Sequence, residues 1–136
     1  MSGRGMREHY VRPEGLPPTN GYSHAVAFTG RMIAVSGQVP LDGQGRLVGQ
    51  DGQDGAYAQA RQVFENLIAA LAAAGAGMEH VVKLTFYLTD LGDLDAVRRA
   101  RDEFISPDNP PASSLVEVKG LVHPAFRVEI DALASV

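Results

Sequence analysis

The sequence predicts a two-layer α+β domain in which one mixed β-sheet packs against two helices. The periodic segments follow in the order strand, strand, short strand, helix, strand, helix, strand, strand, and two strand–helix units on one sheet give this architecture. The chain has 136 residues, the length of one domain. Its residues are 45% hydrophobic and 21% charged, close to a soluble globular average. We therefore expect residues 1–136 to form a single domain.

Residues 1–20 are expected to be an N-terminal arm or loop, because their prolines exclude a long helix and a central strand. Beyond the arm, residues 24–29 and 32–39 are two apolar runs separated by Gly30-Arg31. This spacing is typical of a β-hairpin.

The second strand of the expected hairpin ends in a polar patch. Ser36 and Gln38 fall on the same face, because side chains alternate along a strand. Pro40 ends the strand, residues 42–45 have strong turn chemistry, and residues 46–48 are an expected short return strand.

Residues 54–74 form the clearest helix, with Asp54 as a candidate N-cap and Gly75 placed for the left-handed C-terminal position. Its stripe recurs at spacings of three and four residues and consists of Tyr57, Ala60, Phe64, Leu67, Leu71 and Ala74.

Residues 81–89 alternate between apolar and polar side chains, as in a half-buried strand. A second helix is expected over residues 93–105, before the prolines of residues 107–111 break the chain. Its narrow apolar stripe consists of Leu94, Val97, Ala100 or Arg101, and Phe104. Residues 114–118 and 126–133 are the last two strands.

The final strand has one apolar and one polar face. Its apolar side chains are Phe126, Val128, Ile130 and Ala132, and the opposite face carries Arg127, Glu129, Asp131 and Leu133. The polar face is either exposed to solvent, as one face of an antiparallel sheet commonly is, or an interface lined with functional groups.

Composition excludes several classes of function. The chain has no cysteine, which excludes disulfides, thiolate nucleophiles and cysteine-ligated metals. The net charge is −4, and the basic residues at 98–101 are followed at once by Asp102 and Glu103, which argues against a nucleic-acid partner. The four histidines lack metal-ligand spacing. No stretch has the length of a membrane span and no apolar signal core begins the chain, so we expect a cytoplasmic protein.

Five runs of the chain closely resemble the YjgF/RidA (Rid) family, formerly called endoribonuclease L-PSP. The resemblance extends in order from about Gly21 to Ala134. The matching runs are GYSHAV at 21–26, VSGQVP at 35–40, AQARQVFENL at 58–67, VVKLT at 81–85 and VEIDALA at 128–134.

The resemblance implies a chorismate-mutase-like fold and a homotrimer with the sheets inside and the helices outside. It implies a ligand cleft at each subunit interface. Active members hydrolyse reactive imines and enamines, such as 2-aminoacrylate, to 2-keto acids and ammonia without a cofactor. By the same resemblance, Tyr22 and Ser36 line the cleft and Glu129 is the catalytic residue that positions the attacking water.

Two residues depart from the family pattern. Deaminating members carry Pro-Ala-Arg-Ser before the penultimate strand, whereas this chain has Ser113 at the arginine position. A serine supplies neither the charge nor the two-donor fork that a substrate carboxylate requires. On the second helix the family often has Val-Asn, and this chain has Arg98 at the asparagine position.

Two interpretations follow from these departures. In the first, another arginine supplies the missing guanidinium. Arg98 is one candidate, the alternative being that it lies on a solvated helix face. Arg127 is the other, the alternative being that it forms a structural ion pair. In the second, the site binds a different ligand, for example one without a carboxylate, and Ser113 is one of the residues that bind it.

Three functions remain under comparison. The first is a Rid-family hydrolase of an imine, enamine or related small metabolite. The second is a non-catalytic trimeric protein that binds a small-molecule metabolite in the same cleft. The third is an endoribonuclease, against which the acidic charge balance and the lack of paired histidines argue.

Overall fold

The structure is a computed structural model that describes residues 5–49 and 51–136. Its strands and α-helices follow in the order β1 (Arg7–Tyr10), β2 (Ala25–Phe28), β3 (Met32–Gln38), α1 (Gly52–Ala73), β4 (Val81–Leu88), α2 (Leu94–Arg101), β5 (Ala112–Glu117) and β6 (Val128–Ser135). Two short 3₁₀ helices, Met78–His80 and Leu91–Asp93, precede β4 and α2.

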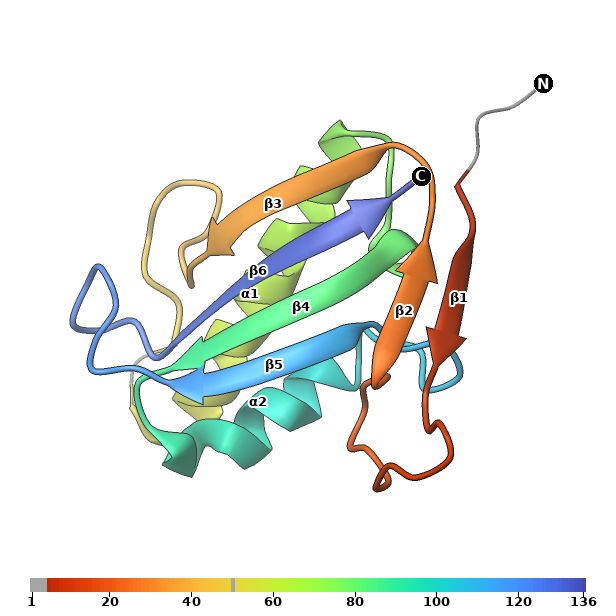
Figure 1. The fold of residues 1–136 in the computed structure, drawn as a ribbon. Helices are drawn as coiled ribbons and strands as arrows, with labels where there is room; N and C mark the ends of the chain where they lie inside the picture. Colours follow the sequence, from red (N-terminus) through yellow and green to blue (C-terminus); the bar gives the residue numbers. More distant parts are fainter. Residues whose placement is uncertain (1–4, 50) are drawn as a thin grey trace.

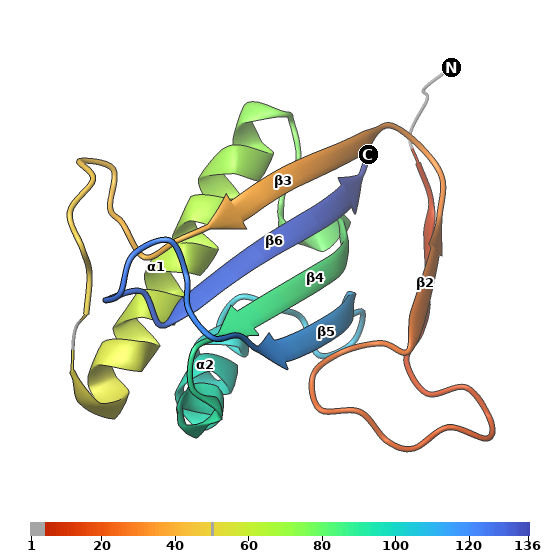
Figure 2. The ribbon, with the colours of Figure 1, turned by 60° about the vertical axis from the view of Figure 1, so that its left-hand side comes forward.

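The main layer is a four-stranded sheet in the order β3-β6-β4-β5, and α1 and α2 cover one of its faces (Figure 1, Figure 2). The strand β6 pairs antiparallel with β3 and β4, whereas β5 runs parallel to β4. The predicted α+β fold with a mixed sheet on two helices is therefore confirmed. Within the described residues, no helix has the length and apolarity to cross a membrane.

The predicted hairpin between residues 24–29 and 32–39 is wrong. Instead, β2 pairs antiparallel with β1, so residues 7–10 of the expected arm form a strand. The chain leaves this small sheet at Gly30, whose φ of +109° is open to glycine but unfavourable for other residues. Arg31 then exchanges two backbone hydrogen bonds with Val136, which starts the pairing of β3 with β6. The local pattern showed the strands correctly but not their partners.

Other boundaries differ by smaller amounts. The expected return strand at 46–48 is reduced to a single bridge between Leu41 and Leu47. The helix α1 starts after Asp51, so Asp54 lies in its first turn and is not the N-cap. The C-terminal Gly75 has the predicted positive φ, +81°. The helix α2 ends at Arg101, four residues before the expected end.

The core lies between the sheet and the helices. One stripe of α1, including Phe64 and Leu67, is fully buried against the inner residues of β4 and β6, such as Leu84 and Ile130. Burial of these apolar side chains is the main favourable contribution to folding. The opposite face of the sheet is open, and Met32 on β3 is 60% exposed there.

Candidate functional site

A cavity of about 270 Å³ lies between α2, the β5 edge of the sheet and the segment before β2. The structure brings three predicted site residues together on its wall: Tyr22, Arg98 and Ser113. The complete wall consists of Asn20, Tyr22, Phe86, Leu94, Val97, Arg98, Arg101, Ser113 and Leu115.

Each of the three predicted residues reaches the cavity from a different element. Ser113 pairs in register with Leu84, so it faces the helix layer. Arg98 lies one turn beyond Leu94 on α2. Tyr22 precedes Ser23, which bridges to Ala112 at the start of β5.

Arg98 is half-buried, and no hydrogen bond or ion pair to another described residue holds its guanidinium. Its donors are therefore available to a ligand. Among the described residues that line the cavity none is a carboxylate, whereas Tyr22 and Ser113 add hydroxyl donors. This donor set suits an anionic ligand. In residues 5–49 and 51–136, no group of three His, Cys, Asp or Glu side chains is placed to hold a metal ion.

A second cluster of predicted residues lies at the other side of the sheet. The register of β3 against β6 shifts between Val35 and Gln38, and this bulge contains Ser36 and Gly37. The Glu129 carboxylate lies directly against Gly37, where a Cβ atom would overlap its Oε2. Ser36 is exposed beside it. The missing side chain of Gly37 thus leaves the space that the Glu129 carboxylate occupies.

The two clusters do not meet within one chain. Ser36 lies on β3 and Ser113 on β5, the opposite edges of the four-stranded sheet. Three strand spacings of about 4.8 Å separate these edges by roughly 14 Å. Glu129, on the central strand β6, is paired with Tyr87 and so points away from the helix layer, whereas Ser113, paired with Leu84, points toward it. If Glu129 is to face the cavity that holds Tyr22 and Ser113, it therefore has to come from a second chain.

The uncovered face around Glu129 carries further negative charge. Glu129 is paired in register with Tyr87, whose hydroxyl donates a 3.0 Å hydrogen bond to Asp131 Oδ2. This hydrogen bond raises the pKa of Tyr87, and the charges of Asp131 and Glu129 raise it further. The polar face of β6 is thus a set of interacting groups.

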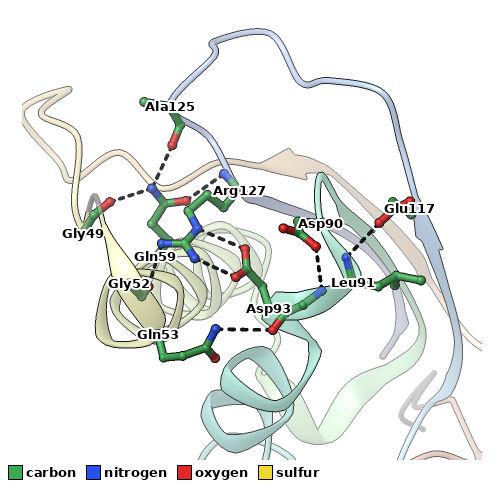
Figure 3. A network of polar contacts seen from close by, with 11 residues as sticks. Gly49, Gly52, Gln53, Gln59, Asp90, Leu91, Asp93, Glu117, Ala125 and Arg127 are labelled. Carbon is green, nitrogen blue, oxygen red and sulfur yellow. Dashed lines mark hydrogen bonds and ion pairs between the residues drawn. The ribbon is translucent and has the colours of Figure 1, made fainter.

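Arg127 lies in an ion pair and does not line the cavity (Figure 3). Its Nε donates to Asp93 Oδ2 at 3.0 Å, its Nη2 to Asp93 Oδ1 at 2.6 Å, and its Nη1 to the Gly52 carbonyl at 2.7 Å. Asp93 is only 4% exposed. Of the two alternatives for Arg127, the structure shows the structural ion pair.

Gln59, which sequence reasoning missed, completes this network from α1. It is fully buried, its Oε1 accepts from the Arg127 backbone N–H at 2.8 Å, and its Nε2 donates to the carbonyls of Gly49 and Ala125. The sequence signal that could have identified Gln59 as buried is its spacing of four residues from Val63, which places both residues on the same face of the helix.

Arg101 is the second residue that sequence reasoning missed. It lines the same cavity as Arg98 but is only 8% exposed. Its spacing of four residues from Val97 placed it among the alternatives for the buried stripe. The sequence held no sign of its partner, Asn20, which lies 81 residues away.

We predict that Asp93→Asn lowers the free energy of unfolding by about 3 kcal/mol, because it removes the negative charge from a buried ion pair and keeps its shape. Urea denaturation at a fixed protein concentration measures the change. Asp95→Asn, at an exposed position in the first turn of α2, is the matched control and is expected to change stability by less than about 0.5 kcal/mol. Equal effects of the two variants would contradict the structural role of the pair.

Known proteins resemble this chain over nearly its whole length. The family model described as endoribonuclease L-PSP matches residues 13–136. Protein DfrA of Myxococcus xanthus is 39% identical over 133 residues, which cover 96% of this chain and 98% of that protein. A 2-iminobutanoate/2-iminopropanoate deaminase of Salmonella typhimurium is 37% identical over 126 residues, which cover 91% of this chain and 94% of that protein.

Solved structures show the same relationship. The Rid-family protein YyfB of Yersinia pestis, of unknown function, matches with a TM-score of 0.84 and 33% identity, covering 96% of this chain and 98% of that one. RidA from an Antarctic Psychrobacter species matches with a TM-score of 0.70 and 31% identity, covering 95% and 100%. The chain therefore belongs to the YjgF/RidA (Rid) family.

Proposed function

We propose that this chain is a hydrolase that converts small reactive imines or enamines to keto acids and ammonia. The observation that carries the proposal is Arg98, which lines the cavity beside Ser113 with its donors available. The helix α2 thus supplies a guanidinium to the cavity, whereas β5 has Ser113 at the position of the family arginine. Relatives 37% identical to this chain bear the name 2-iminobutanoate/2-iminopropanoate deaminase.

In the proposed complex, Arg98 binds the substrate carboxylate through two parallel N–H donors. The hydroxyls of Tyr22 and Ser113 can donate further hydrogen bonds to the same ligand. Phe86 and Leu94 give the cavity an apolar wall against which a short aliphatic side chain packs. The imine carbon is thereby fixed for attack.

Glu129 of a neighbouring subunit is the proposed general base. It accepts a proton from water as the water oxygen bonds to the imine carbon, giving a carbinolamine. The protonated carboxyl then returns the proton to nitrogen. As the carbon–nitrogen bond breaks and ammonia leaves, the carbinolamine hydroxyl gives its proton to the Glu129 carboxylate and becomes the carbonyl of the keto acid.

The proposed assembly is a homotrimer with the sheets inside. The separation of Tyr22 from Glu129 within one chain supports it, since a shared cleft would bring these halves together. The open face of the sheet also supports it: Met32 is 60% exposed and Val116 is 45% exposed there. Covering such apolar side chains favours association.

A non-catalytic metabolite-binding protein is the second candidate, and Ser113 is the observation that favours it. Ser113 stands at the position of the family arginine, and its hydroxyl carries no charge. A cavity that binds an anion through Arg98 from a different direction would hold a metabolite without orienting it toward Glu129.

We expect the wild-type protein to accelerate ammonia release from 2-aminoacrylate generated in place by a serine dehydratase. Arg98→Ala is predicted to lower this acceleration about 30-fold or more, because a desolvated charge contact is lost. Arg99→Ala is the matched control: Arg99 is exposed on the same helix and lies over the Tyr57 ring.

Equal rates for Arg98→Ala and wild type would contradict the role of Arg98. Absence of acceleration by the wild type, together with thermal stabilisation by 2-oxobutanoate, would favour the metabolite-binding candidate instead.

Gly37→Ala is predicted to lower the deamination rate toward that of Glu129→Ala, because the added methyl group overlaps the Glu129 carboxylate. The φ of Gly37 is not positive, so alanine fits its backbone conformation. In the Glu129→Ala background, Gly37→Ala should have no further effect on the rate. Full activity of the single Gly37→Ala variant would contradict the placement of Glu129 as the base.

A further inference from the structure

The buried guanidinium of Arg101 holds the chain segment that precedes Tyr22. Its Nη1 donates to the Asn20 carbonyl at 2.9 Å, and its Nη2 donates to Asn20 Oδ1 at 2.8 Å. Two donors from one rigid fork thus engage one residue, which fixes direction as well as distance. The helix α2 and the segment before β2 are joined through this contact.

Gly21 adapts the backbone to this guanidinium. Its φ of +72° lies in the left-handed region, and a Cβ atom built on it would lie 2.5 Å from Arg101 Cζ. The guanidinium therefore rests against the bare Cα atom. Any larger residue at Gly21 would have to displace Arg101 or change the backbone, and Tyr22 is the next residue along the chain.

A second anchor follows Tyr22 immediately. Ser23 is 1% exposed, its Oγ donates to the Pro110 carbonyl at 2.6 Å, and its N–H donates to the Pro111 carbonyl at 3.0 Å. This anchor joins the segment to the start of β5, which carries Ser113. Tyr22 is thus held between one contact to the helix of Arg98 and one to the strand of Ser113.

We infer that Arg101 is a positioning residue, which fixes the Tyr22 side chain on the cavity wall by holding the backbone at Asn20 and Gly21. The inference rests on the proposed function in so far as Tyr22 is a cleft residue. The two arginines of the cavity then have separate tasks: Arg98 binds the ligand and Arg101 shapes the site.

The hydrogen-bond inventory of Arg101 supports this division. Its Nε and Nη2 also donate to Asp102 Oδ1, at 3.0 and 2.8 Å. Four of its five N–H groups are therefore used by neighbouring residues, against none for Arg98 among the described partners. Asp102 is 65% exposed at its side chain and balances the buried charge at the surface.

The direct test is fluorine NMR of protein labelled with 3-fluorotyrosine, which gives one resonance for each of the four tyrosines. Tyr22→Phe assigns the Tyr22 signal. Arg101→Met is expected to shift and broaden this signal and to leave those of Tyr10 and Tyr87 in place. Asn20→Ala removes only the side-chain half of the contact at an exposed position, and it should cause a smaller change in the same resonance.

Arg99→Met is the matched control. The Arg99 guanidinium lies 4.5 Å from the centre of the Tyr57 ring, so this variant should move the Tyr57 signal and not that of Tyr22. An unchanged Tyr22 resonance in Arg101→Met would overturn the inference. So would a change of all four resonances in Asn20→Ala, since this would indicate a general loss of structure.

Deamination kinetics provide the second readout. Arg101→Met should lower kcat/KM about tenfold to a hundredfold, since misplacement of a site by about 1 Å has effects of this size. In the Tyr22→Ala background it should have no further effect. Multiplying effects would overturn the inference by showing that Arg101 acts other than through Tyr22. If the wild type has no deaminase activity, the proposed function fails while the NMR result still decides the role of Arg101.

Discussion

The position of the C-terminal strand β6 between β3 and β4 is the constraint on which the rest of the structure depends. Both ladders of β6 are antiparallel. Because side chains alternate along the strand, one face of β6 packs under α1 and the other presents Glu129 and Asp131. Because β6 occupies the middle of the sheet, β3 and β5 become opposite edges. Ser36 is thereby separated from Ser113, and the proposed cleft has to be shared between subunits.

The distribution of arginine side chains distinguishes this chain from the family pattern. With Ser113 on β5, positive charge at the cavity comes only from α2 among the lining residues, through Arg98 and Arg101. The two arginines differ in burial and in hydrogen bonding. Arg101 donates hydrogen bonds to Asn20, whereas the Arg98 guanidinium donates to no described residue. Arg127 is engaged with Asp93 at another end of the sheet. Charge count alone would not have shown which of the three guanidinium groups is left without a partner among the described residues.

The sequence predicted what local periodicity determines and little of what long-range pairing determines. The core stripe of α1 and the alternation of β6 follow from spacings of three to four residues and of two. The wrong prediction of a hairpin around Gly30 arose because a turn residue does not show whether the two strands that flank it pair with each other. The contact of Arg101 with Asn20 spans 81 residues, so no local pattern could indicate it. The family resemblance identified Tyr22 and Glu129 as candidate site residues. That they lie apart within one chain could be recognised only from the order of strands in the sheet.

Mixing subunits tests the shared cleft most directly. Arg98→Ala and Glu129→Gln chains, each expected to be strongly impaired alone, are combined into mixed assemblies by joint expression, and ammonia release from 2-aminoacrylate is measured. In a mixed assembly, the intact cavity of the Glu129→Gln chain meets the intact Glu129 of the Arg98→Ala chain. The account predicts that activity returns in the mixture. A rate no higher than that of either parent would contradict a cleft built from two subunits.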